Sequence, residues 1–203
     1  MAEVGIVNYG IGNTGSILNM YRKLGIGAVG VTRPQDVVTA RRLILPGIGA
    51  FDACMNALTN SGMRTAILDA IDAGRPLLGI CVGMQMLTLG SEEGNAPGLG
   101  LIPAFTRRFP ADPSLRVPHM GWNSVRWTNP RDTLAAELGK DSRFYFVHSY
   151  RVICESADNA LALCSYSGEF AAAIRSDHVA GVQFHPEKSH RFGLQLLRNF
   201  AAT

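Results

Sequence analysis

The heptapeptide Leu77-Leu78-Gly79-Ile80-Cys81-Val82-Gly83 passes from an apolar run into a cysteine flanked by glycines. The apolar residues predict a buried strand, and the pattern after Cys81 predicts a helix that continues through Leu89. A G-x-C-x-G sequence between a strand and a helix is the thiol form of a nucleophile elbow, a sharp turn that exposes a reactive side chain. The flanking glycines fit this turn because it leaves little room for Cβ atoms.

Similar strand and helix patterns precede this segment. Residues 4–8 and 42–45 form apolar runs that predict buried strands. Between them, apolar residues at helical spacing predict a helix from about Thr14 that ends at Gly25. Such alternation of strands and helices favours a parallel sheet with helices on both of its faces.

The second half of the chain is richer in strands. Half of the ten prolines lie in the segment 97–118, which predicts loop with short edge strands. Strands are then predicted at 144–147, 161–165, 170–174 and 179–184, and a last helix near 189–201. We therefore expect one α/β domain over residues 1–203, with a central mostly parallel sheet flanked by helices and an antiparallel extension.

The composition restricts the classes of function. The net charge of the 203 residues is only +3, so the chain lacks the basic footprint of a nucleic-acid-binding protein. No apolar run approaches the roughly 18 residues of a membrane span, and the N-terminus lacks the pattern of a signal peptide. The cysteines show no CxxC spacing, so we expect no disulfides and a cytoplasmic location.

Cys81 is the candidate nucleophile. The positive end of the helix that follows it favours a thiolate at this position. The other three cysteines lack such a setting and are interpreted as structural: Cys54, Cys154 and Cys164.

His185 is the candidate base among five histidines. It ends a predicted strand, and Glu187 is two residues further on. Residues i and i+2 of an extended chain face the same side, so Glu187 can orient the His185 ring. H-x-E also occurs in zinc deaminases, but these require a later P-C-x-x-C, and no cysteine follows Cys164. We therefore expect no metal site.

A second glycine-rich turn follows the strand at 42–45. In Pro46-Gly47-Ile48-Gly49-Ala50, the glycines allow backbone N–H groups to turn toward a developing oxyanion, together with the N–H of Val82. One such donor typically lowers the barrier by about 3 kcal/mol.

Five motifs occur in an order that resembles the class I, or triad, glutamine amidotransferases. Within that family, the chain most resembles the subfamily of glutaminase subunits of imidazole glycerol phosphate synthase. The resemblance covers essentially the whole chain. The motifs are PGIGAF (46–51), GICVGMQ (79–85), PHMGWN (118–123), RFYFVHSY (143–150) and QFHPEKS (183–189).

This resemblance implies a reaction without a cofactor. Cys81 would attack the carboxamide of L-glutamine to give a thioester, and His185, oriented by Glu187, would pass a proton to the departing ammonia. Gln85 and backbone groups near Gly49, Ser149 and Tyr150 would hold the glutamine. The family hydrolyses glutamine slowly until the substrate of its partner binds, which implies that the loop at Gly47 and Ile48 reorients one N–H group.

The resemblance also implies a partner, a (β/α)8-barrel cyclase that receives the ammonia within a heterodimer. The expected contact residues are Asn8, Gly10, Asn13, Trp122 and Lys188. His148 is interpreted as a structural histidine and not as a second base.

Three alternatives remain open on the sequence. Residues 10–15 read G-x-G-x-x-G, the pattern of a dinucleotide-binding module. This motif also requires an acidic residue about twenty residues further on, and Asp36 matches that requirement poorly. Asn8 and Thr14 stand where the subfamily usually has Asp and Leu. The stretches 15–25 and 185–200 resemble paralogues that supply ammonia for sugar amidination in surface-polysaccharide synthesis. A free-standing cysteine hydrolase, active without a partner, is the third.

Overall fold

The computed structural model describes residues 1–111, 115–166 and 168–203. Its main sheet is built on five parallel strands in the order β2-β1-β3-β4-β12. Their bounds are β1 Ala2–Val7, β2 Ala28–Val31, β3 Ala40–Gly47, β4 Leu77–Cys81 and β12 Val179–Val182. All five residues of β4 are buried, as expected for a strand covered on both faces.

An antiparallel extension continues the sheet beyond β12, through β11, β10 and β7, while β9 pairs with β11 and β5. The bounds are β5 Ala104–Arg108, β7 Arg126–Trp127, β9 Tyr150–Cys154, β10 Ala160–Ser165 and β11 Glu169–Ser176. A separate two-stranded sheet consists of β6 (His119–Ser124) and β8 (Arg143–His148). The expected parallel sheet with an antiparallel extension is therefore confirmed.

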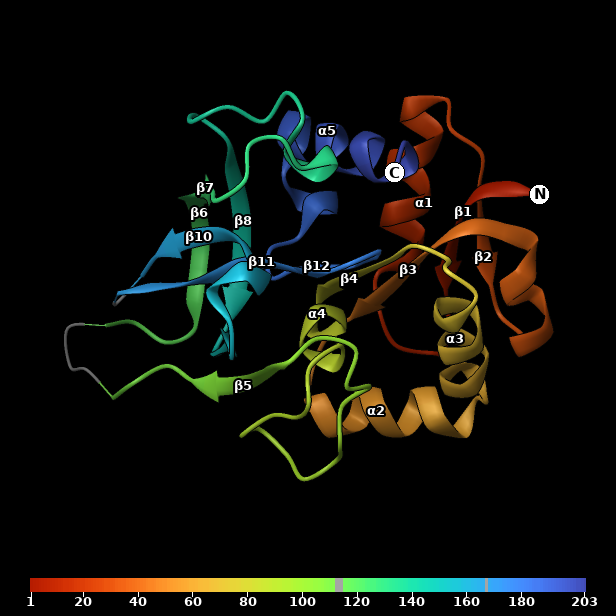
Figure 1. The fold of residues 1–203 in the computed structure, drawn as a ribbon, viewed down its shortest axis with the longest axis horizontal. Coiled ribbons are helices and arrows are strands. Elements are labelled where there is room, and N and C mark those ends of the chain that lie inside the picture. The colour runs from red at the N-terminus through yellow and green to blue at the C-terminus, as the bar shows by residue number, and fades with distance from the viewer. Residues whose placement is uncertain (112–114, 167) are drawn as a thin grey trace.

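Helices cover both faces of the parallel strands (Figure 1). On one face lie α1 (Thr14–Leu24) and α5 (His190–Ala201), and on the other lie α2 (Phe51–Asn60) and α3 (Met63–Asp72). The two helices of the first face are joined by a hydrogen bond of 3.1 Å from the buried Tyr21 hydroxyl to the Leu197 carbonyl. Helix α1 ends, as predicted, at Gly25, which adopts a left-handed conformation with φ of 68°.

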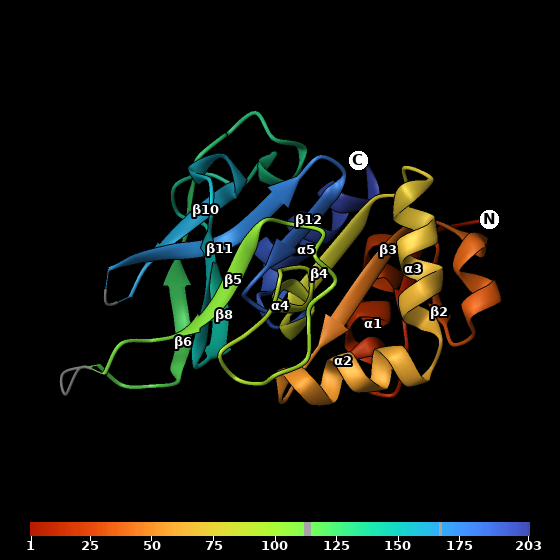
Figure 2. The same ribbon diagram turned by 60° about the horizontal axis from the view of Figure 1, so that its bottom comes forward.

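Short 3-10 turns complete the described elements: η1 Pro34–Thr39, η2 Thr133–Ala135, η3 Ala157–Asn159 and η4 Pro186–Lys188. The proline-rich segment contains β5, which pairs with β9 and is drawn in green in Figure 2. Residues 112–114 of that segment lie outside the described residues. None of the described helices is both long enough and apolar enough to cross a membrane.

Two predicted elements extend two or more residues beyond the observed ones. The helix after Cys81, α4, spans Val82–Met86 and does not reach Leu89, because Thr88 Oγ1 donates to the Gln85 carbonyl and the Leu89 N–H pairs with Ala104. Strand β12 ends at Val182 and not at Phe184, because the chain turns toward β8, where the His185 N–H donates to the Tyr145 carbonyl at 2.9 Å.

Candidate active site

Cys81 occupies the turn between β4 and α4, with φ of 57° and ψ of −115°. A non-glycine residue at positive φ is uncommon and costs of order 1–3 kcal/mol, so the surrounding structure must impose this conformation. Close packing at Gly83 contributes to this constraint, because a Cβ at Gly83 would lie 1.9 Å from the Leu45 carbonyl oxygen. The first turn of α4 therefore lies directly against β3, and Cys81 is held at the tight turn that its flanking glycines predicted.

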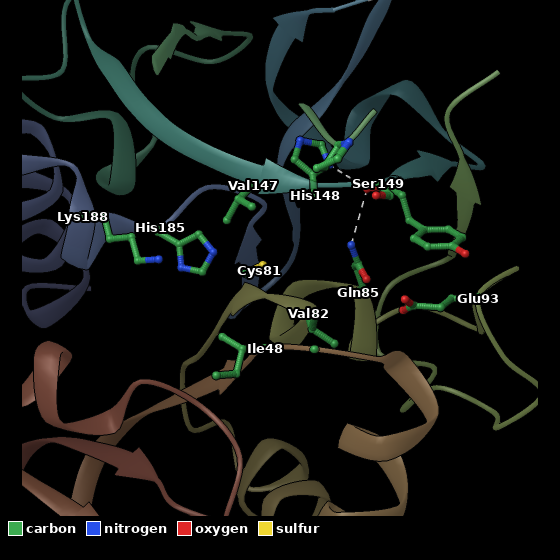
Figure 3. Close-up of a pocket in the computed structure, with 13 residues that line it drawn as sticks. Ile48, Cys81, Val82, Gln85, Glu93, Val147, His148, Ser149, His185 and Lys188 are labelled. Carbon is green, nitrogen blue, oxygen red and sulfur yellow. Dashed lines mark hydrogen bonds between the residues drawn. The ribbon is translucent and has the colours of Figure 1, made fainter. Parts of the chain in front are cut away.

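A cavity of about 460 Å³ opens above Cys81. Figure 3 shows Cys81 between the ring of His185 and the side chains of Gln85 and Glu93. Many of the predicted site residues line this cavity: Ile48, Gly49, Cys81, Val82, Gln85, Ser149, Tyr150, His185 and Lys188. Segments that are far apart in the sequence thus meet at one pocket.

His185 and Glu187 form a buried pair. His185 Nδ1 lies 2.8 Å from Glu187 Oε1, and each side chain is at most 3% exposed. The predicted contact is confirmed, but the expected extended geometry was wrong, since residues 186–188 form the turn η4. A carboxylate only accepts hydrogen bonds, so Nδ1 carries the proton and Nε2 is left as the reactive nitrogen.

The neighbours of His185 strengthen it as a base. Burial by itself would lower the pKa of His185, but the neighbouring Cys81 and Glu187 raise it above its usual value. His185 Nε2 is buried, and it has no hydrogen-bond partner within 1–111, 115–166 and 168–203. This arrangement suits a histidine that takes a proton from the thiol at Nε2, while the carboxylate at Nδ1 stabilises the positive charge of the ring.

The backbone of His185 is anchored by a residue that the sequence reasoning did not assign. The buried Ser189 hydroxyl donates to the His185 carbonyl at 2.6 Å and accepts from the Tyr145 N–H at 3.0 Å. Ser189 stands in the QFHPEKS segment, so its place near the site could be read from the sequence. Its contact with β8 could not, because that contact is between distant segments.

Gln85 is fixed by a second glutamine. Its Nε2 donates to Gln183 Oε1 at 3.1 Å and reaches the Tyr150 carbonyl at 3.5 Å. Gln183 Nε2 in turn lies 4.0 Å from Cys81 Sγ. Gln183 is completely buried and links the side chain expected to hold glutamine to the candidate nucleophile.

Further residues line the cavity that were not predicted as site residues: Glu93, Pro118, Val147 and His148. Glu93 Oε2 accepts from the Phe51 N–H at 2.9 Å, and its carboxylate adds negative charge to the pocket wall. Its position could not be inferred from the sequence, because it lies in an irregular segment.

His148 is a fully bonded structural histidine, as predicted. The Tyr150 carbonyl only accepts, so the 2.7 Å contact makes His148 Nδ1 the donor. His148 Nε2 then accepts from His119 Nδ1 at 3.0 Å, and His119 Nε2 accepts from Asn123 Nδ2 at 3.3 Å. Burial lowers the pKa of His119 to about 4 and that of His148 to about 3, so both rings are neutral.

The remaining predicted residues lie outside the cavity lining. Gly47 ends β3, where an added Cβ would lie 2.5 Å from the Gly83 nitrogen, so its role is close packing beneath the site. Asn8 and Gly10 are exposed and Asn13 is partly exposed at the start of α1. Trp122 is 46% exposed on β6, and its ring lies 5.3 Å from that of His190.

The family model for glutamine amidotransferase class-I matches residues 5–203. The chain belongs to the class-I glutamine amidotransferase family. As a member of that family it is a glutamine amidotransferase enzyme with an α/β fold. The rival interpretation of residues 10–15 as a dinucleotide-binding module is thereby set aside.

Relatives within this amidotransferase family align with nearly the full chain. It is 46% identical to "Imidazole glycerol phosphate synthase subunit HisH 2" of Methanococcus maripaludis, over 97% of this chain and 98% of that protein. It is 45% identical to the protein of the same name from Pseudomonas aeruginosa, over 96% of each chain. "Imidazole glycerol phosphate synthase subunit HisH" of Bdellovibrio bacteriovorus is also 45% identical, over 97% of this chain and 98% of that protein.

Solved structures share the fold at lower identity. PurLQS from Thermotoga maritima superposes with a TM-score of 0.72 at 17% identity, covering 97% of this chain and 96% of that chain. The glutaminase domain of CTPS from Trypanosoma brucei, with bound acivicin, gives a TM-score of 0.66 at 15% identity, covering 98% of this chain and 94% of that chain.

Proposed function

We propose that this chain is the glutaminase subunit of an imidazole glycerol phosphate synthase, in which it hydrolyses L-glutamine and passes ammonia to a cyclase partner. The main support is that the strained Cys81 and His185, which is paired with the buried Glu187 side chain, line one cavity of about 460 Å³. The three relatives at 45–46% identity are all named as HisH subunits of that synthase.

In the proposed reaction, the Cys81 sulfur attacks the carboxamide carbon of glutamine after its proton moves to His185 Nε2. The C–N bond then breaks, the nitrogen takes this proton and leaves as ammonia, and a γ-glutamyl thioester remains on Cys81. Water, deprotonated by His185, hydrolyses the thioester to glutamate and restores the thiol. Glu187 holds the ring and stabilises its positive charge through Nδ1.

Substrate binding follows from the charges of the cavity wall. Glutamine carries an α-ammonium group, and the Glu93 carboxylate is the complementary charge among the described lining residues. We assign the carboxamide oxygen to backbone N–H groups of the turn Gly47–Gly49 and to that of Val82, and the remainder of the substrate to Gln85 and the backbone of Ser149 and Tyr150. These N–H groups act on charge that develops in the transition state.

The proposed partner is a (β/α)8-barrel cyclase in the cytoplasm, which receives ammonia near the mouth of the cavity. Apolar side chains are exposed there: Ile48 lines the cavity, Val117 precedes the lining residue Pro118, and Met120 follows Pro118 by two residues. Trp122 and Lys188 extend this surface, and we assign Asn8, Gly10 and Asn13 to its edge. Exposed apolar residues that gather in one region are typical of a protein interface.

Cys81→Ala tests the assignment in the complex with the cyclase. Because the sulfur forms the covalent bond, the variant should lose glutamine-dependent product formation by at least about 10³-fold. It should form product normally from ammonium chloride, since the partner would be intact. Loss of both activities, or retention of the glutamine-dependent one, would contradict the assignment.

The identity of the ammonia acceptor requires a second experiment. Asn8 and Thr14 depart from the synthase subfamily, and the stretches 15–25 and 185–200 resemble a sugar-amidinating paralogue. The glutaminase chemistry would be the same in both cases. The wild-type chain should therefore be assayed with each barrel partner encoded near it. Product from the aminoimidazole ribotide precursor supports the synthase, and product only from an N-acetyl sugar supports the paralogue.

A further inference from the structure

A completely buried glutamine, Gln183, lies beside the candidate nucleophile and takes no part in the proposed chemistry. Strands β12 and β4 pair in parallel, with Val182 opposite Ile80. The residues that follow, Gln183 and Cys81, are therefore neighbours where the two strands end. The Gln183 N–H donates to the Ala172 carbonyl of β11 at 2.8 Å, which anchors its backbone. A buried amide side chain is costly unless its polar atoms are bonded, so the contacts of this one indicate its role.

The hydrogen bonds of Gln85 determine which way the Gln183 amide points. The Tyr150 carbonyl can only accept, so the Gln85 atom that lies 3.5 Å from it is the nitrogen (Figure 3). The same nitrogen lies 3.1 Å from Gln183, whose nearer atom must accept and is therefore Oε1. Gln183 Nε2 is then the atom that lies 4.0 Å from Cys81 Sγ. The sulfur thus faces an N–H donor and not a carbonyl oxygen.

The two ends of the Gln183 amide have different consequences. Both hydrogens of the Gln85 nitrogen are used in the contacts with Tyr150 and Gln183, so its oxygen remains for the substrate in the cavity that Gln85 lines. Without the acceptor on Gln183, one reason for this orientation of the Gln85 amide is lost. At the other end, a hydrogen-bond donor beside a sulfur stabilises the thiolate more than the thiol, and the thiolate is the form that reacts.

We propose that Gln183 is a positioning residue whose single amide orients the Gln85 side chain toward the substrate and donates to the Cys81 sulfur. This inference rests on the proposed glutaminase function. The contact with Gln85 acts on the binding of glutamine, so its loss should raise KM. The contact with Cys81 acts on the nucleophile, so its loss should slow the reactions of the sulfur.

Steady-state glutamine hydrolysis by the complex with the cyclase tests the contact with Gln85. Gln183→Met keeps nearly the same volume but loses both polar atoms, so we expect KM to rise about fivefold, as for one lost hydrogen bond. Gln85→Met should raise KM at least as much. The double variant should have a KM within about twofold of that of Gln85→Met, because Gln183 acts on the substrate through Gln85. Effects on KM that multiply in the double variant would overturn the orienting role.

Gln183→Glu separates the acceptor from the donor. It keeps an oxygen that accepts from Gln85, so its KM should stay within about twofold of wild type. A KM as high as that of Gln183→Met would overturn the proposal. Gln183→Leu removes the same polar atoms and replaces Gln183→Met if that variant does not fold.

Alkylation by iodoacetamide in the absence of glutamine tests the contact with Cys81. Mass spectrometry of the peptides separates Cys81 from the other three cysteines. At neutral pH the alkylation rate of Cys81 should fall about fivefold in Gln183→Met, because the thiolate loses a donor. In Gln85→Met the rate should stay within about twofold of wild type, because the donor is kept. An unchanged rate in Gln183→Met would overturn the donation to the sulfur.

Asn199→Leu is the matched control, since Asn199 is a buried amide in α5 that donates to the carbonyls of Leu134 and Ala136. It should leave KM and the alkylation rate unchanged, and effects equal to those of Gln183→Met would overturn the proposal. A wild-type complex that fails to hydrolyse glutamine overturns the proposed function, whereas an active wild type with unaffected Gln183 variants overturns the positioning role alone.

Discussion

At the scale of the residue, the strained backbone of Cys81 is the feature that most closely connects structure with reactivity. Its φ of 57° and ψ of −115° are imposed by the tight turn between β4 and α4. The nucleophile therefore stands at a conformation that any side chain other than glycine occupies at a cost. In variants that lack the thiol, this cost should be measurable as a difference in the free energy of unfolding.

Cys81→Gly should be more stable than Cys81→Ala by about 1 kcal/mol, because glycine tolerates positive φ and alanine does not. At an ordinary position the order is reversed, since glycine has more entropy to lose on folding. Urea denaturation of the two inactive variants measures the difference. An alanine variant that is the more stable of the two would show that the turn is not strained.

At the scale of the element, the approach of α4 to β3 and β4 depends on three glycines. A Cβ at Gly47 would lie 2.5 Å from the Gly83 nitrogen, and one at Gly79 would lie 2.5 Å from the Gly83 carbonyl oxygen. The overlap at Gly83 is the closest, with the Leu45 carbonyl. The helix can start directly over the strands only because all three lack side chains.

Gly83→Ala should lower the free energy of unfolding by at least about 3 kcal/mol, because the added methyl group meets backbone that cannot move aside. Gly15→Ala is the matched comparison within helix α1, where nothing lies within 4 Å of the added atom. That variant should be more stable than wild type by about 0.5–1 kcal/mol, through helix propensity. Chemical denaturation of both variants tests the contrast, and similar effects at the two positions would contradict it.

At the scale of the whole molecule, the two-stranded sheet is tied to the main sheet by buried neutral histidines. His119 lies on β6 and His148 ends β8, directly opposite in the ladder, and the bond of His148 to Tyr150 continues into β9. Their pKa values of about 4 and about 3 lie below the roughly 6.5 of an unfolded histidine. Their contribution to stability is thus complete above pH 6.5 and is lost as the pH falls toward 4.

His148→Gln should reduce the pH dependence of stability. When the pH falls from 7.5 to 5.5, each buried neutral histidine lowers the free energy of unfolding by about 1.4 kcal/mol, because the unfolded chain gains a proton that the folded chain does not. The variant has one such group fewer, so its stability should change by about 1.4 kcal/mol less over this range. His185, whose pKa is raised, contributes with the opposite sign but is present in both proteins. Urea denaturation at the two pH values tests this, and equal pH dependence would refute it.

Many features of the protein follow from the sequence alone, because short contiguous segments encode them. Apolar runs predicted four of the five parallel strands, namely β1, β3, β4 and β12, and G-x-C-x-G predicted the turn at Cys81. The two-residue spacing of His185 and Glu187 predicted their contact. The assignment of function required more than these patterns, namely the resemblance of five motifs to a known family.

Other features were decided only by the tertiary structure. The cavity wall at Glu93 and the contact of Ser189 with Tyr145 join segments that are distant in the chain. The same is true of the hydrogen bond from the Tyr9 hydroxyl to the Pro46 carbonyl. The end of α4 was also mispredicted, because Leu89 bonds to Ala104 in place of continuing the helix. A local pattern determines what a segment can form, whereas buried donors and acceptors are paired by whichever groups the packed fold brings within reach.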